Sequence, residues 1–475
     1  MKNNKQKLFT ISEFRRQVGI PLVLAQKLVV WGVVKTEKAI DGSLRIAGSE
    51  IVKAQEFVKS PYRKTILFIR ALGPGLITGA ADDDPGGIGT YSSVGAKFGY
   101  AIIWMAPWLL PLMISVQEVC ARIGIVTNKG LAGVLQKRYK RRIVAAIVIL
   151  LIIANVVNIG ADIKAMADSC RLLIPVNFIV IAILLTLIII ILEITIPYQT
   201  YAKILKWLTI SLFAYVICGF VVHPDWLFVL KNTIIPNISF NKYYIFAMIA
   251  VFGTTISPYL FFWQTSEEVE EQKLPQGQAR SMKYRIGHMR TDVNTGMIFA
   301  NLAFFFIVLT TAQVLFKNGI TDVVSAEQAA LALKPLAGDK AFLLFALGVI
   351  GTGLLAIPVL AGSGAYALSE LVKWREGLGN KFSQAYGFYS IIIVSILVGF
   401  GLNFLGIGPI KALYYSAFLN GVIAVPLLVV IMVIGNDKKI MGKEIHPAWV
   451  KFFGWLAAGS AFLAVCAFLI LSFMR

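Results

Sequence analysis

Three consecutive aspartates, Asp82, Asp83 and Asp84, are the residues best suited to chemistry in this sequence, and Pro85 and two glycines follow them. They lie inside an apolar segment that runs from about residue 66 to residue 98. A carboxylate in hydrocarbon costs at least about 2.5 kcal/mol, and a proline followed by glycines interrupts a helix. Such a break is tolerated at membrane depth only where it lines a cavity or binds something. The pattern predicts a cation site; the alternative is a kinked helix whose aspartates lie at the outer surface.

A second break interrupts a later apolar segment, residues 243–270, at Ser257, Pro258 and Tyr259. Hydroxyl side chains precede the proline, and Thr254 is one of them. By count, this is the sixth apolar segment, and the aspartates lie in the first. Interrupted helices at matching positions of two halves indicate a transporter built from inverted repeats, with its substrate site near the bilayer midplane. Because each half has an odd number of segments, we expect a 5+5 inverted repeat plus one extra helix.

The composition requires a membrane protein. Of the 475 residues, 57% are hydrophobic, and the mean hydropathy is +0.75. A soluble core cannot use that much apolar surface, so the sequence predicts an all-α membrane protein with many spans. The formal net charge of +20 suggests nucleic acid, but basic cytoplasmic loops account for it. The glycines after Pro85 follow no strand and precede no P-loop lysine, so they are not a nucleotide-binding loop. We expect a transporter without a cofactor, not an enzyme.

Eleven apolar segments are long enough to cross about 30 Å of hydrocarbon. Their approximate spans are 66–98, 101–122, 142–170, 174–196, 204–222, 243–270, 291–316, 341–372, 384–409, 412–435 and 452–474. If the N-terminus is cytoplasmic, all five inner loops carry lysine or arginine, as residues 137–142 illustrate, and the outer loops hold scattered lysines such as Lys231, Lys317 and Lys411. This positive-inside pattern predicts a multi-pass protein of the plasma membrane with a cytoplasmic N-terminus.

Residues 1–62 are polar and mixed in charge, and we expect them to form a small cytosolic domain ahead of the transmembrane domain, residues 63–475. Thr10 and Glu13 have the spacing of a capping box that opens a short helix. A second helical pattern holds Leu24, Leu28 and Trp31, and Gly32 can end it.

Residues 33–46, with Asp41-Gly42 in their middle, can form a hairpin or wing. The order of helix, turn, helix and wing resembles the small DNA-binding domains of the excisionase and MerR type. Nucleic acid is therefore an alternative partner of residues 1–62. We favour a cytosolic cap that docks or regulates.

The motifs of the first two membrane segments resemble the Nramp family of divalent metal transporters. The first carries Gly73-Pro74-Gly75 and then Asp84-Pro85-Gly86-Gly87, where the family has Gly-Pro-Gly and Asp-Pro-Gly-Asn. The second carries Gln117-Glu118, followed by Ala121-Arg122-Ile123-Gly124-Ile125-Val126-Thr127. The resemblance covers about residues 66–435. It implies a LeuT-like fold and transport of divalent metal ions through the lipid bilayer.

The chain departs from the family at several site positions. Gly87 stands at the family's asparagine, Ser257 at its methionine, Tyr259 and Gln264 at two histidines, and Asn155 at a glutamate that precedes Asp162. This pattern resembles the Nramp-related magnesium transporters. The resemblance implies Mg²⁺ as the transported ion, with Mn²⁺ as a second substrate.

The expected donors at this site are all oxygen atoms. Thioether sulfur favours softer metals, whereas carboxylate, carbonyl, hydroxyl and water suit Mg²⁺ and Mn²⁺. We expect Asp84 as the anionic ligand, direct or through water, with the Ser257 hydroxyl, the Thr254 carbonyl carried over from the family and a backbone group of Gly87. Mg²⁺ usually keeps several waters, which suits a site with few protein ligands. The spacing leaves open whether Asp82 and Asp83 face the ion.

Two further groups of charged residues are ambiguous. Asp162, with Lys164 and Asp168 nearby, can line an inner polar path or pair within the bundle. Four glutamates are expected at a solvated helix end: Glu267, Glu268, Glu270 and Glu271.

We expect transport without proton coupling, because the three histidines of the chain fall in expected loops and a proton carrier usually needs one. Three alternatives are a proton-coupled Mn²⁺/Fe²⁺ importer, a carrier of an organic substrate, and a membrane-tethered metal-sensing regulator with a DNA-binding head. The oligomeric state is open.

Overall fold

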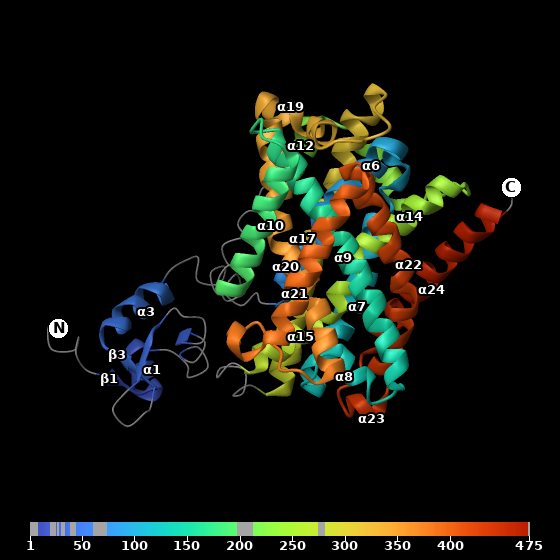
Figure 1. The fold of residues 1–475 in the computed structure, drawn as a ribbon. Helices are drawn as coiled ribbons and strands as arrows, with labels where there is room; N and C mark the ends of the chain where they lie inside the picture. The colour runs from blue at the N-terminus through green and yellow to red at the C-terminus, as the bar shows by residue number, and fades with distance from the viewer. Residues whose placement is uncertain are drawn as a thin grey trace. The chain divides into compact units, whose positions relative to one another are not determined.

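The computed structural model describes residues 8–19, 25, 28–29, 34–38, 44–59, 74–196, 212–273 and 281–473. Two compact units divide the chain, a small one within Met1–Gly73 and a large one that begins at Pro74. Figure 1 shows the helices and strands of both.

The described part of the small unit contains two helices and a three-stranded antiparallel sheet. Helix α1 (Ile11–Val18) opens with the expected capping box, in which the Glu13 amide donates to Thr10 Oγ1 and the Thr10 amide donates to Glu13 Oε2. The sheet has the order β1 (Leu8–Phe9), β3 (Leu44–Ala47), β2 (Thr36–Lys38), and helix α3 (Ser49–Lys59) follows it. The hydrophobic core of the small unit includes the buried side chains of Phe9, Phe14, Leu28, Ile46 and Ala54.

The expected hairpin is present, since β2 and β3 pair antiparallel with Thr36 opposite Ile46. The Asp41-Gly42 turn lies outside the described residues. So do Leu24, Trp31 and Gly32, on which the second expected helix depends, and only Ala25, Leu28 and Val29 of that stretch are described.

The large unit is a bundle of helices (Figure 1). Its α-helices are α5 (Pro74–Asp82), α6 (Pro85–Phe98), α7 (Met105–Thr127), α8 (Leu131–Leu135), α9 (Arg141–Arg171), α10 (Phe178–Thr195), α12 (Phe213–Val221), α13 (Trp226–Ile234), α14 (Lys242–Thr255), α15 (Pro258–Lys273), α17 (Met282–Val314), α18 (Ala326–Ala330), α19 (Lys334–Ala337), α20 (Ala341–Val372), α21 (Tyr386–Gly401), α22 (Pro409–Gly435), α23 (Lys438–Met441) and α24 (Ala448–Phe473). Short 3₁₀ turns are η2 (Gly99–Ile102), η4 (Phe316–Asn318), η5 (Leu331–Leu333), η6 (Gly338–Lys340), η7 (Phe382–Gln384) and η8 (Leu402–Leu405).

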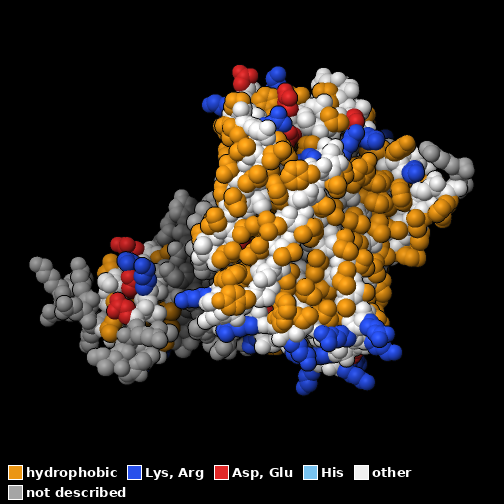
Figure 2. All heavy atoms as spheres, viewed as in Figure 1, with side chains coloured by type: hydrophobic (Ala, Val, Ile, Leu, Met, Phe, Trp, Pro, Cys, Tyr) orange, Lys and Arg blue, Asp and Glu red, His pale blue; other side chains and the backbone are white. Residues whose placement is uncertain are grey.

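Within the described residues, nine helical stretches are long and apolar enough to cross a membrane. Two of the eleven expected spans are not among them. The first is divided into α5 and α6, each too short to span alone. The fifth, residues 204–222, is described only from residue 212 on, and its helix α12 is too short to span alone. Figure 2 shows apolar side chains along the flank of the unit, with Lys and Arg gathered at the end that carries α8 and α23.

Glycines bring the two broken segments very close to their neighbours. A Cβ on Gly79 of α5 would lie 2.3 Å from the carbonyl oxygen of Gly296 on α17, and one on Gly253 of α14 would lie 2.1 Å from that of Ala417 on α22. Small residues allow such approach between helices in lipid, where packing rather than the hydrophobic effect drives association. These contacts set the positions of α5 and α14.

Asp292 fixes the start of α5 as well. Its carboxylate accepts the amides of Gly75 and Leu76, at 2.7 Å and 3.1 Å. The first amides of a helix have no partner within it, so α17 supplies the missing acceptors.

Candidate functional site

The first break lies between Asp82, where α5 ends, and Pro85, where α6 begins. Asp84 is the N-cap of α6, and its Oδ1 accepts the Gly87 amide at 2.6 Å. Pro85 occupies the first helical position, where a missing amide costs nothing. The aspartate and the proline therefore start a new helix at membrane depth.

The second break lies between Thr255, where α14 ends, and Pro258, where α15 begins. The Ser257 hydroxyl lies in this break and donates toward the carbonyls of Gly253 and Thr254, at 2.7 Å and 2.9 Å. The last carbonyls of a helix lack partners and carry the negative end of its dipole, which favours cations. Two such helix ends, those of α5 and α14, occur at the breaks.

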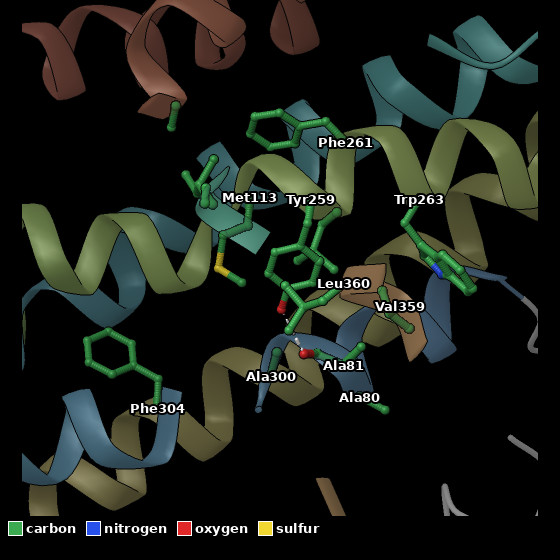
Figure 3. Close-up of a cluster of buried hydrophobic side chains, with 14 of the residues drawn as sticks. Ala80, Ala81, Met113, Tyr259, Phe261, Trp263, Ala300, Phe304, Val359 and Leu360 are labelled. Carbon is green, nitrogen blue, oxygen red and sulfur yellow. Dashed lines mark hydrogen bonds between the residues drawn. The ribbon is translucent and has the colours of Figure 1, made fainter. Parts of the chain in front are cut away.

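Tyr259 connects the two breaks. Its hydroxyl lies 3.0 Å from the Ala81 carbonyl oxygen and 3.3 Å from Asp84 Oδ2, and Figure 3 shows the phenol pointing toward Ala81. Tyr259 was not among the expected ligands, although the resemblance already placed it at a histidine position of the family. Its place immediately after the proline of the second break is the signal that indicates it.

Gly87 and Thr254 also meet at this junction. A Cβ on Gly87 would lie 3.5 Å from Thr254 Oγ1, 3.1 Å from the Asp82 carbonyl oxygen and 3.3 Å from the ring of Tyr91. The structure thus brings Gly87 and Thr254 together. Asp84 lies at the same junction, because its carboxylate contacts the Gly87 amide and the Tyr259 hydroxyl. Ser257 is placed at the same junction by its bond to the Thr254 carbonyl.

Four carboxylates are buried around the breaks. Asp82, Asp83, Asp84 and Asp162 are each at most 4% exposed. Within the described part of the chain, the carboxylate oxygens of Asp82 and Asp83 have no hydrogen-bond partner, whereas the Asp162 carboxylate lies near the backbone amide of Gly86. Asp162 lies on α9 close enough to Asp84 to interact with its charge. Buried carboxylates without donors cannot all stay ionised unless a cation joins them, so the arrangement suits a positive ion.

These positions bear on three residues whose place the spacing left open. Asp82 and Asp83 face the protein interior and not the outer surface. Asp162 belongs with the break, whereas Lys164 and Asp168 line a separate cavity.

A polar chain leads from the breaks along α15. Thr78 Oγ1 donates to Gln264 Oε1 at 2.5 Å, and Gln264 Nε2 donates to Glu268 Oε1 at 3.0 Å. Glu267 and Glu268 are each 5% exposed, so the expectation of a solvated helix end is wrong for these two, whereas Glu270 and Glu271 are partly exposed. The physical reason is that α15 continues to Lys273 against α7, where a Cβ on Gly124 would lie 2.3 Å from the Thr265 carbonyl oxygen.

The three histidines lie away from the breaks. His223 follows α12, and His446 is in the loop before α24. His288 lies within α17 and its ring stacks on Tyr284, so the expectation that all three are in loops is wrong for His288.

No three His, Cys, Asp or Glu side chains of the described residues converge as the ligands of a firmly held structural metal would. The donors at the breaks are instead the oriented carboxylate of Asp84, backbone carbonyls and hydroxyls, with three further buried carboxylates around them. Hard cations such as Mg²⁺ usually keep several waters, so this donor set suits a partly hydrated cation better than a closed cage does.

Comparisons with known proteins identify the same architecture. A family model described as natural resistance-associated macrophage protein-like, Nramp, matches residues 75–471. The divalent metal cation transporter MntH of Klebsiella pneumoniae subsp. pneumoniae is 26% identical over 392 residues, which cover 81% of this chain and 90% of that protein.

Two solved structures share the fold. The Eremococcus coleocola manganese transporter, in complex with an aromatic bis-isothiourea substituted compound, has a TM-score of 0.66 at 18% identity and covers 86% of this chain and 87% of its own. Mhp1, a nucleobase-cation-symport-1 family transporter, has a TM-score of 0.52 at 12% identity and covers 85% and 92%. These likenesses confirm the expected all-α, LeuT-like membrane fold.

Proposed function

Because the chain belongs to the Nramp family and is a membrane transporter of divalent metal ions, not an enzyme, we propose that it carries Mg²⁺, with Mn²⁺ as a second substrate, and moves no protons with them. The proposed ligands are the Asp84 carboxylate, the Ser257 hydroxyl, the Thr254 carbonyl and a backbone group of Gly87.

The observation that carries this proposal is the set of oxygen donors at the two breaks. Ser257 offers a hydroxyl whose proton is turned toward the Gly253 and Thr254 carbonyls, which leaves its lone pairs free to face an ion. Asp84 contributes the carboxylate that Tyr259 and the Gly87 amide orient. Carboxylate, carbonyl, hydroxyl and water oxygens suit Mg²⁺ and Mn²⁺ better than softer metals.

The absence of a histidine supports transport without protons. Tyr259 and Gln264 occupy the two positions where the family has histidine, so neither position carries a titratable imidazole. Both side chains make hydrogen bonds with other groups of the protein. The membrane potential then drives uptake, at about 2.3 kcal/mol per elementary charge per 100 mV.

The basic loops support a cytoplasmic N-terminus in the plasma membrane. Lys and Arg gather at the end of the large unit that carries α8 and α23, which we assign to the cytoplasm (Figure 2). Residues 1–62 then form a cytosolic domain ahead of the transmembrane domain, residues 63–475.

Two observations favour the proton-coupled Mn²⁺/Fe²⁺ importer as the second candidate. Asp162 lies near Asp84 and can carry a proton in place of histidine. Met166 lies close to Pro85 where both pack against Gly353, so a thioether occurs beside the first break.

The decisive experiment measures uptake of Mg²⁺, Mn²⁺, Ca²⁺ and Cd²⁺ into proteoliposomes at a fixed negative potential, with internal pH recorded. We expect Mg²⁺ and Mn²⁺ to enter without acidification. Acidification that follows metal entry in the wild type and is absent in Asp162→Asn would establish the second candidate. Strong Cd²⁺ uptake that Met166→Leu removes would contradict the oxygen-only site.

A further inference from the structure

Three charged residues follow one face of α9 away from the candidate metal site. Lys164, Asp168 and Arg171 are spaced i, i+4 and i+7, which places them on one side of the helix over about 10 Å of its length. They line a cavity of about 350 Å³. Its other lining residues are Phe178, Ile179, Ala182, Phe400, Asn403, Phe404 and Pro409.

The cavity carries an excess of positive charge. Asp168, its one carboxylate, accepts the amide of Ala326 at 3.1 Å. The Lys164 ammonium donates to the Asn403 carbonyl at 3.3 Å and lies 5.8 Å from the centre of the Phe178 ring. Neither Lys164 nor Arg171 makes a salt bridge with any part of the chain that the structure describes. The Asp168 charge acts on Lys164, and Arg171 is exposed, so the cavity keeps one positive charge in excess that an anion can balance.

The position of this cavity in the bundle indicates the source of the anion. The cavity lies where α9 ends, α10 begins and η8 leads into α22. Its rim is apolar and exposed, with Ile179 at 45% and Phe404 at 62% exposure. Those side chains belong to the flank that faces hydrocarbon in a bilayer. Charged groups there cost free energy unless they reach the interface or a counter-ion.

This end of the unit is opposite the basic loops, because α9 begins beside residues 137–142 and runs the length of the bundle to Arg171. Cations at such an end are not explained by the positive-inside pattern. A ligand with a negative group and acyl chains fits this cavity, because the negative group can pair with the two cations and the acyl chains can pack against the apolar rim.

We propose that this cavity binds the phosphate group of an anionic phospholipid, with Lys164 and Arg171 as its basic partners and the aromatic rim against the acyl chains. Two basic residues close to an anionic headgroup raise its affinity about 30-fold. The site is separate from the metal-binding breaks, and it does not depend on which metal is carried.

The test uses the full chain in nanodiscs of phosphatidylcholine, to which phosphatidylglycerol is added. We expect phosphatidylglycerol to raise the midpoint of thermal unfolding and to remain bound in native mass spectra. The variant K164Q/R171Q should reduce the apparent affinity about 30-fold. K164R/R171K, which keeps both charges, should behave as the wild type, and so should K231Q/K317Q, which removes two exposed lysines elsewhere.

Two results would overturn the proposal. One is an undiminished effect of phosphatidylglycerol on K164Q/R171Q. The other is an equal effect of inorganic phosphate on the wild type, which would show a site for free anions. If K164Q/R171Q does not fold, the test is competition between phosphatidylglycerol and phosphatidylcholine for binding to the wild-type protein. Equal occupancy by the two lipids would contradict a site for an anionic phospholipid.

Discussion

Asp84 has two roles at the first break, because one oxygen accepts the Gly87 amide and the other lies beside the Tyr259 hydroxyl. The residue therefore caps a helix and also presents charge to the junction. Tyr259 keeps that carboxylate in place from the other broken segment. At the scale of single residues, the candidate site is a carboxylate held in a fixed direction by two donors.

Replacing Asp84 with asparagine should remove transport while leaving the helix cap, since asparagine is also a good N-cap. Loss of a buried charge that pairs with an ion costs about 2–5 kcal/mol, so we expect uptake to fall at least about 30-fold. Metal uptake into proteoliposomes measures this, with size-exclusion chromatography as the control for folding. Uptake at the wild-type rate would exclude Asp84 as the ligand.

Replacing Ser257 with methionine should change selectivity, because a soft sulfur takes the place of a hydroxyl. We expect the affinity for Cd²⁺ relative to Mg²⁺ to rise on the order of tenfold. Competition of Cd²⁺ with Mn²⁺ uptake is the measurement, and Ser257→Ala is the matched control that removes the hydroxyl without adding sulfur. Unchanged selectivity in Ser257→Met would place the ion elsewhere.

At the scale of elements, the short helices α5 and α14 lie so close to neighbouring helices that no side chain fits between them. Helix α5 meets α17 at Gly79 and Gly296, and α17 also supplies Asp292 to the start of α5. The loop before α24 fixes another interface, where Arg122 of α7 donates to the Glu444 and Ile445 carbonyls.

Replacing Gly79 with alanine should destabilise the large unit, because the added Cβ would lie 2.3 Å from backbone that cannot move aside. Overpacking of this kind costs about 1–3 kcal/mol. The matched control is Gly459→Ala in α24, where nothing lies within 4 Å, and which should stabilise the helix by about 0.5–1 kcal/mol. Thermal unfolding in detergent compares the two, and equal midpoints would contradict the close contact.

His446 should make stability fall in mild acid. Burial, with the nearby charges of Arg122, Lys451 and Arg290, lowers the pKa of His446 from 6.5 to about 3. Between these two pKa values, the imidazole of His446 is protonated in the unfolded chain and neutral in the folded chain. The contribution of His446 to the free energy of unfolding is therefore fully present above pH 6.5 and is lost as the pH falls toward 3. From pH 7 to pH 5 the loss is about 2 kcal/mol.

Thermal unfolding at both pH values checks this. His446→Gln should show a smaller decrease of the midpoint between pH 7 and pH 5 than the wild type. His223→Gln, which changes an exposed histidine, should show the wild-type decrease. Equal decreases in wild type and His446→Gln would contradict a buried neutral imidazole.

At the scale of the whole molecule, the described chain consists of two compact units with separate cores. The candidate metal site, its helix contacts and the proposed lipid cavity all belong to the unit that begins at Pro74. Transport should therefore be a property of this unit.

Deleting residues 1–60 should leave metal uptake into vesicles at the rate of the full chain, because no residue of the candidate site lies before Pro74. Uptake normalised to inserted protein is the measurement. A truncated protein that inserts and elutes as a single species but transports nothing would make the small domain part of the mechanism. A mobility-shift assay with the full chain tests the alternative of a DNA-binding regulator.

The sequence by itself determined the class of the fold and the two breaks. Hydropathy requires many membrane helices, and Pro85 and Pro258 interrupt helices wherever they occur, because each removes an amide donor. The capping box at Thr10 and the N-cap at Asp84 are equally local, since they join residues three apart.

Only the tertiary structure decided which side chains meet. Asp162, Tyr259 and Asp84 come from three different helices, and their approach depends on how α9 and α15 pack around the first break. The same packing buries Glu267 and Glu268, which local sequence would place in water. Periodicity states which residues share a face of one helix, whereas contacts between helices depend on shapes that glycines such as Gly79 and Gly253 allow only in the folded bundle.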